Sequence, residues 1–366
     1  MDDIFINDIC KFNITHNKHL IKENMNVIVS SFFKRNEYYK NFNIYVKGLK
    51  KLLKYVETKK KDYTYLLFID ENINNDNNIM NMVKKCSNCV VIVFTCSKYM
   101  IDKYHIDLFG TLVRFFPMFN FKNNPCNIVI CVDIDLHEQD YFRFNKLITE
   151  QYKGIVGNGS FIEFIKGSHD KPHLYAGSIS YNIKKSDYNL ITDFIINIKD
   201  ITTPGRYNTR FTDFGYGVDE IFLNDILLPK IGSVGVIIEY YISYFLFHSY
   251  DRILSQPKKS EKILSAILGR YNTEINNTND IKEKLNFIDA NTYKIRKRTD
   301  INNTLSKRFS KVIKYLYNNK IKWMNWNIIK FIHKYLSNVI SATAVMYYDY
   351  NKNKITTVKL YDKVEF

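Results

Sequence analysis

Two aspartates that directly follow an apolar run are the residues best placed to do chemistry. Residues 128–132 have the composition of a buried strand, and Asp133 and Asp135 come next. Residues i and i+2 of an extended segment point to the same side, so we expect the two carboxylates to lie together. They repel each other unless one is protonated or a cation lies between them. Mn²⁺ and Mg²⁺ prefer carboxylate and phosphate oxygens, which predicts a divalent ion that carries a diphosphate. The alternative is that one Asp caps a helix and the other is solvated.

Further side chains could complete such a site. Arg114 precedes the apolar run and could offer a planar pair of donors to a phosphate oxygen, or form an ordinary surface ion pair. His248 follows an apolar run and could be a third metal ligand, or a buried histidine of the core. His169 and His173 are four residues apart, but Pro172 disfavours a helix between them. Substrate hydrogen bonding or a polar loop therefore remain as roles for the two histidines.

An acidic pair, Asp219 and Glu220, follows a glycine-containing turn at the expected start of a helix near Val218. Acids in a first helical turn interact favourably with the helix dipole, so a cap is one explanation. The same position is expected to lower the pKa of the carboxyl group, which suits a base that must stay ionised. Adjacent helical residues point about 100° apart, so only one acid can face a given substrate atom. Asp219 is the favoured base and Glu220 the acceptor binder or structural partner, although the two roles could be exchanged.

The elements that must position these residues alternate between strands and helices. Apolar runs predict strands over residues 27–32, 65–69, 90–94 and 128–132. Apolar residues at helical spacing predict a helix over 44–56, and a second helix is expected over 106–119. This alternation is typical of a Rossmann-like α/β domain, in which ligands bind beyond the carboxyl ends of the strands. Three residues at the ends of the first two strands are therefore expected to contact a nucleoside: Ser30, Phe32 and Asp70.

Common nucleotide-binding and hydrolase signatures are absent from the sequence. No GxGxxG follows the first strand, and no GxxxxGK[ST], GxSxG or HExxH occurs. These absences disfavour a dinucleotide-binding dehydrogenase, a P-loop NTPase, an α/β-hydrolase and a zinc protease. Cys86 and Cys89 are separated by two residues, but no second pair at zinc-ribbon spacing accompanies them.

Three segments resemble the glycosyltransferase-A (GT-A) nucleotide-sugar fold, and in particular the glycosyltransferase-like proteins of large DNA viruses. The first is GTLVRFFPMF (110–119) ahead of the two aspartates, where the family has an arginine that faces the donor diphosphate. The second is SHDKPHLYAGS (168–178), which resembles a segment between donor and acceptor. The third is FGYGVDEIFL (214–223), which resembles a "YGxDExFL" helix start. The resemblance implies acceptor-binding roles for residues of the second segment: His169, Asp170, His173, Ala176 and Gly177.

The charge is distributed unevenly along the chain. The whole chain has a formal charge of +16, and residues 251–366 contain 23 Lys and Arg against 10 Asp and Glu. We expect an N-terminal extension (1–20), a GT-A-like domain (21–250) and a basic, mainly helical C-terminal region (251–366). Two apolar helical stripes, over 305–316 and 328–339, favour a packed helical pair in that region. Its basic face could bind an anionic partner, such as a membrane surface or a polyanion, or reflect only solvation.

The sequence also predicts a cytoplasmic location, in the host cytoplasm if the protein is viral. The N-terminus lacks the basic and apolar regions of a signal peptide. Residues 231–247 are interrupted by Glu239 and fall short of a spanning helix. Five cysteines on apparent buried strands fit reduced thiols: Cys86, Cys89, Cys96, Cys126 and Cys131.

The function expected from these features is transfer of a sugar from a nucleotide-diphosphate donor to an unknown glycan or protein acceptor. Mn²⁺ or Mg²⁺ is the expected cofactor, held by Asp133, Asp135 and His248. One alternative is a polymerase-β-type nucleotidyltransferase, which needs a Gly-Ser turn before its acids, whereas Gly232-Ser233 lies after them. Another alternative is a non-catalytic binding or scaffold protein that retains a degenerate transferase fold.

Overall fold

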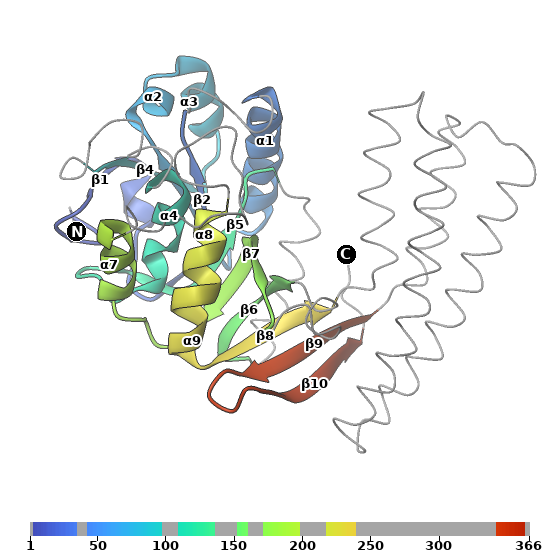
Figure 1. Cartoon of the computed structure of the whole chain (residues 1–366). Coiled ribbons are helices and arrows are strands. Elements are labelled where there is room, and N and C mark those ends of the chain that lie inside the picture. The colour runs from blue at the N-terminus through green and yellow to red at the C-terminus, as the bar shows by residue number, and fades with distance from the viewer. Residues whose placement is uncertain are drawn as a thin grey trace, which may run out of the picture.

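One mixed β-sheet organises the chain (Figure 1). The computed structural model describes residues 3–34, 42–96, 109–135, 152–159, 171–197, 217–238 and 342–362. These ranges contain ten strands: β1 (Lys11–His16), β2 (Met25–Phe32), β3 (Thr64–Ile69), β4 (Cys89–Thr95), β5 (Cys126–Val132), β6 (Gly154–Gly159), β7 (Leu174–Asn182), β8 (Ser233–Ile238), β9 (Ala342–Asp349) and β10 (Lys354–Asp362). The strands lie in the order β1-β4-β3-β2-β5-β7-β6-β8-β9-β10.

The parallel part of the sheet confirms the α/β prediction. β4, β3, β2 and β5 are neighbours and all run in the same direction. In chain order they are the third, second, first and fourth parallel strands, which is the order of a Rossmann-like half. All four predicted strands are present, and their apolar runs are buried on both faces, as a parallel sheet requires. The order reverses between β2 and β5, so the carboxyl ends of these two strands mark the expected ligand crevice.

Reversed strands extend the sheet beyond β5. β7 pairs antiparallel with β5 and with β6, and β8 then runs parallel to β6. The hairpin of β9 and β10 continues the sheet from β8. Residues 342–362, which were expected within a mainly helical C-terminal region, are two strands of the main sheet. The two predicted helical stripes at 305–316 and 328–339 lie outside the described residues.

The N-terminal residues belong to the sheet as well. β1 pairs antiparallel with β4, and Phe5 and Phe12 are buried in the core. The expected N-terminal extension (1–20) is thus an edge strand with its own apolar anchor over the described residues 3–20. Cys10 and Cys96 flank the paired ends of β1 and β4 and form a disulfide. This corrects the expectation that Cys96 is a reduced thiol, whereas the other four predicted cysteines are free and buried.

Helices cover both faces of the sheet (Figure 1). Helix α1 (Phe42–Thr58), with the short α2 (Glu71–Asn74) and α3 (Asn77–Val83), packs on one face. The other face carries the remaining helical segments: α4 (Gly110–Leu112), the 3₁₀ segment η4 (Val113–Met118), α7 (Asn189–Asn197), α8 (Val218–Ile221), the π-helical η6 (Phe222–Leu227) and α9 (Leu228–Ile231). A single 3₁₀ turn, η1 (Lys18–Leu20), joins β1 to β2. Within the described ranges, none of these helices has the length and apolarity needed to cross a membrane.

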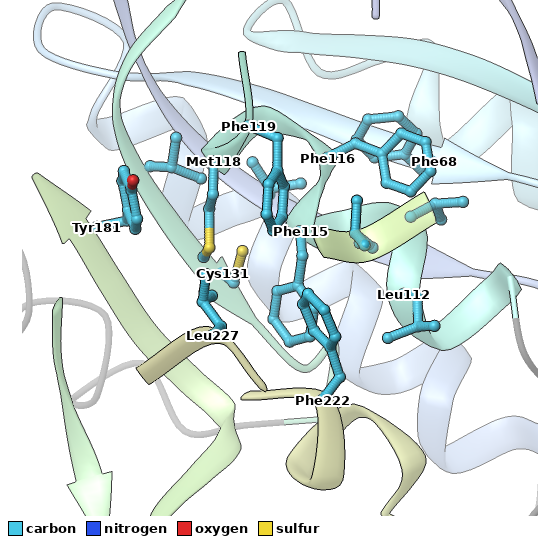
Figure 2. Packing of buried hydrophobic residues seen from close by; sticks show 14 of the residues in the cluster. Phe68, Leu112, Phe115, Phe116, Met118, Phe119, Cys131, Tyr181, Phe222 and Leu227 are labelled. Carbon is cyan, nitrogen blue, oxygen red and sulfur yellow. The ribbon is translucent and has the colours of Figure 1, made fainter. Parts of the chain in front are cut away.

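An aromatic cluster fixes η4 against the helix that begins at Val218 (Figure 2). The rings of Phe115 and Phe222 are stacked with centroids 6.2 Å apart, and Phe119 lies 6.0 Å from Phe222. All three side chains have no exposed surface. Each buried aromatic ring contributes a large apolar area, so this contact holds the two segments in a fixed relative position. Arg114 precedes Phe115, and Asp219 lies one helical turn before Phe222, so the cluster determines where both charged side chains lie.

Candidate functional site

A buried arginine joins two of the predicted site residues. Arg114 lies in η4 and is 4% exposed. One terminal nitrogen, Nη1, donates to Asp133 Oδ1, and the other, Nη2, donates to Asp219 Oδ2 at 2.6 Å. Arg114 is 19 residues from Asp133 and 105 from Asp219 along the chain, so the fold alone brings the three together. Both terminal nitrogens of Arg114 therefore contact carboxylates, and its expected contact with a phosphate stays a prediction.

The position of Asp133 results from the end of β5. The strand ends at Val132, and the backbone N–H of Asp133 donates to the carbonyl of Gly177 in β7 at 2.8 Å. Residues 134 and 135 form a turn rather than the expected continuation of the strand. Ile134 is buried while Asp133 and Asp135 are partly exposed, and the expectation that the two carboxylates lie together stays a prediction.

Two glycines let neighbouring segments approach these aspartates closely. A Cβ on Gly177 would lie 2.7 Å from Asp133 Oδ2, so a larger residue at this point of β7 would displace the carboxylate. A Cβ on Gly48 of α1 would lie 2.1 Å from the carbonyl oxygen of Ile134 and 2.9 Å from Cα of Asp135. The role of Gly48 was missed in the sequence. The sequence did contain an indication of this role, because Gly48 lies inside an amphipathic helix. A glycine in the middle of a helix costs about 1 kcal/mol relative to alanine, so it is expected there only for a specific reason.

Asp219 lies in the first turn of the helix that begins at Val218, as predicted. Gly217 precedes the helix with φ of 91°, a conformation that glycine adopts readily. The side chain of Asp219 is 15% exposed, and its Oδ1 accepts from the backbone N–H of Glu220 at 3.0 Å. The side chains of Asp219 and Glu220 point in different directions, as expected, because Asp219 contacts Arg114 while Glu220 contacts His173.

Burial sets the acidity of Asp219. Loss of solvation raises its pKa to about 6, and the negative charges of Asp133 and Glu220 act in the same direction, while Arg114 opposes them. The prediction that the helix start lowers this pKa is wrong, because the loss of solvation on burial outweighs any effect of the helix start. The pKa of Arg114 is raised by the two carboxylates, so the guanidinium remains charged. Asp133 and Asp219 contact the guanidinium of Arg114, and Glu220 adds a third negative charge beside Asp219, so the site has an excess of negative charge.

A second contact links the helix to β7. His173 Nε2 lies 3.3 Å from Glu220 Oε2, just before β7 begins. Asn224, within the π-helical η6, accepts from the backbone N–H of Leu174 at 2.8 Å and donates to its carbonyl at 2.9 Å. The Asn224 side chain thus makes the two hydrogen bonds that the backbone of a neighbouring strand would make with Leu174. These bonds fix the helix against the start of β7. Asn224 was also missed, although a polar residue inside the apolar run IFLNDILL was a signal for it.

One face of β7 is directed to the site. His173, Tyr175 and Gly177 alternate with the buried Leu174 and Ala176, so they share a side of the strand. Tyr175 is 39% exposed, which places an accessible aromatic ring two residues from the glycine that contacts Asp133. Ala176, expected in acceptor binding, lies on the opposite side and is 1% exposed.

The three residues expected to contact a nucleoside have structural contacts instead. The Ser30 hydroxyl is buried and hydrogen-bonds to that of Tyr65, and the Phe32 ring stacks on Phe42 with centroids 5.4 Å apart. Asp70 is 3% exposed and caps α2, accepting from the backbone N–H of Ile73 at 3.0 Å. Among the described residues, none of these three contacts Arg114 or the two carboxylates that it binds.

The predicted metal ligands are described only in part. His248 lies outside the described residues, as do His169 and Asp170 of the expected acceptor site. Among the residues that the structure describes, no group of three or more His, Cys, Asp and Glu side chains gathers as a metal site. Asp133 and Asp135 remain as two hard oxygen donors at the carboxyl end of β5, and the Asp133 side chain is 41% exposed.

In the comparison with known proteins, no protein-family model matches the chain, and no curated protein matches it.

Proposed function

We propose that this chain is a metal-dependent glycosyltransferase with a GT-A-like fold, which moves a sugar from a nucleotide-diphosphate donor to an acceptor hydroxyl. The observation that carries the proposal is the buried Arg114, which joins Asp133 and Asp219 where the strand order reverses between β2 and β5. Ligands of open α/β sheets bind at this place. The mixed sheet, with reversed β7 beside β5, also agrees with the fold that the sequence resemblance implies.

The donor set of the site fits a hard divalent ion. Mg²⁺ is commonly held by one or two carboxylates together with substrate phosphates, so a cage of three protein ligands is not required. Asp133 and Asp135 would hold the ion, and the negative excess around Arg114 favours a cation there. When bound, the ion supplies a positive charge that stabilises the departing nucleoside diphosphate.

Arg114 is proposed to act as a positioning residue. Both of its terminal nitrogens are engaged by carboxylates, and its burial prevents rotation toward solvent. Its planar fork sets the relative orientation of the two acids, as a flexible lysine would not. In this proposal, Asp133 would be held toward the donor and Asp219 toward the acceptor.

Asp219 is the proposed general base. With a pKa of about 6 it is mostly ionised at neutral pH, yet it is more basic than an ordinary aspartate. Its carboxylate would take the proton of the acceptor hydroxyl while the oxygen forms a bond to the anomeric carbon. The bond from that carbon to the diphosphate oxygen breaks, and the nucleoside diphosphate leaves with the bonding electrons. His173 and Tyr175, on the same face of β7, would orient the acceptor.

Donor hydrolysis by the full chain, with and without Mn²⁺, tests the proposal. We expect metal-dependent release of nucleoside diphosphate from at least one UDP-, GDP- or ADP-sugar. Asp219→Asn should keep donor binding but lose transfer by about 10²-fold or more, the scale of general-base removal. Asp193→Asn, an exposed acid on α7, is the matched control. Absence of both turnover and binding would favour the non-catalytic scaffold, because the Arg114–Asp133 contact would then be purely structural.

A further inference from the structure

Helix α1 has a row of lysines on its outer side. Lys47, Lys50, Lys51 and Lys54 are all exposed, and their spacing of i, i+3, i+4 and i+7 places them on one side of the helix. We refer to these four residues as the lysine stripe. The opposite side of α1 is apolar and packs on the sheet through its buried leucines and valine: Leu49, Leu52, Leu53 and Val56.

The lysine stripe has no acidic partners in the described part of the chain. No described carboxylate lies within ion-pair distance of any of its four ammonium groups. The acid on α1, Glu57, turns instead to the loop before β4, where it contacts Ser87 and the backbone N–H of Asn88. Like charges three and four residues apart destabilise a helix by about 0.2–0.5 kcal/mol per pair. Through these repulsions the stripe weakens α1 rather than supporting it.

An exposed apolar residue continues the stripe. Ile44 is 46% exposed, the largest fraction among the exposed large apolar side chains of the described residues. It lies three residues before Lys47 and seven before Lys51, so it is on the same side of the helix. α1 thus presents four positive charges and one protruding aliphatic group on a single surface.

We propose that this surface of α1 docks the protein on membranes that contain anionic lipids. Lysine ammonium groups are attracted to such a surface without specific geometry, and Ile44 can enter the boundary between headgroups and acyl chains. The stripe carries no arginine for bidentate phosphate contacts and no aromatic ring for base stacking, so its composition favours a lipid surface over a nucleic acid. This inference is independent of the proposed sugar transfer.

Vesicle sedimentation of the full chain tests the docking surface. Phosphatidylcholine vesicles with and without phosphatidylserine are the probes, and the stripe variant changes all four lysines of the stripe to glutamine. Each lysine near an anionic membrane contributes about 1 kcal/mol, which corresponds to about fivefold in partitioning. The stripe variant should therefore bind phosphatidylserine vesicles at least about 100-fold more weakly, with its helical circular dichroism retained. A control variant with the same change in charge replaces four exposed lysines outside α1: Lys22, Lys84, Lys85 and Lys122.

The control and a second variant separate the possible outcomes. The control variant should keep most of the binding, and an equal loss in both variants would overturn the proposal, because net charge alone would then drive adsorption. Ile44→Ser should weaken vesicle binding severalfold and leave adsorption to duplex DNA unchanged. If the stripe variant binds vesicles as the wild type does, the proposal is wrong. It is equally wrong if the stripe variant loses duplex DNA binding alone, since the surface would then recognise nucleic acid.

Discussion

The acidity of Asp219 makes the stability of the protein depend on pH in a way that one substitution should remove. Its pKa in the folded protein is about 6, compared with an ordinary value of 3.8, because burial disfavours the charged form. The folded state therefore holds this proton more tightly than the unfolded state does. Stability from this group is fully present below pH 3.8, falls as the pH rises toward 6, and stays reduced above it.

The size of this effect follows from the difference in pKa. Each unit corresponds to 1.36 kcal/mol, so the shift of Asp219 is equivalent to about 3 kcal/mol. Asp219→Asn has no such titration, since an amide is neutral throughout. The difference in free energy of unfolding, wild type minus variant, should thus decrease by about 2 kcal/mol between pH 4 and pH 7, because the rest of the change occurs below pH 4, where the unfolded aspartate titrates. The amide of Asp219→Asn can also form a weaker hydrogen bond to Arg114 than the carboxyl group does. Because the amide does not titrate, such a loss changes the free-energy difference by the same amount at every pH.

Urea unfolding of both proteins at several pH values, followed by circular dichroism, measures this difference. Asp193→Asn, on the exposed side of α7, controls for the loss of one negative charge. A difference for Asp219→Asn that stays constant from pH 4 to pH 7 would refute the reasoning. So would a difference that increases with pH, because Arg114 would then dominate over burial.

Three further substitutions test how the site is held. Gly177→Ala should weaken metal-dependent donor binding at least about tenfold in calorimetry, because the new Cβ would displace Asp133; unchanged affinity would contradict this. Phe222→Ala should lower the free energy of unfolding by about 3–5 kcal/mol in urea, since it removes a fully buried ring; a loss below 1 kcal/mol would show that its packing is not needed. Cys10→Ser should cost about 2–4 kcal/mol under oxidising conditions, because the disulfide to Cys96 closes a long loop; equal stability would mean that the thiols do not pair in solution.

Local sequence patterns predicted the parallel part of the fold well. β2 to β5 were found from continuous apolar runs, because strands buried on both faces have no polar positions to obscure them. The start of the helix at Val218 was found from the glycine and acids that precede its apolar residues. β1 and the β9–β10 hairpin were missed, since these strands lie outside the parallel core and depend on pairing partners distant in the sequence.

The sequence identified individual residues of the site but did not predict the contacts between them. Arg114, Asp133 and Asp219 were each singled out, but their contacts depend on the Phe115–Phe222 packing, which no local pattern encodes. The same limit explains the pKa of Asp219, because its burial is a property of the assembled core. Asp70 shows the opposite case: an acid just before a short helix is a normal cap, and the cap is what the structure contains.

Calorimetric titration of the full chain with UDP-, GDP- and ADP-sugars, in the presence of Mn²⁺, tests the proposed function most directly. The proposal predicts binding of at least one donor by the wild type, and loss of that binding when Mn²⁺ is removed or when Asp133 and Asp135 are both changed to asparagine. Absence of binding by the wild type to every donor, or binding that persists unchanged in the double variant, would contradict it.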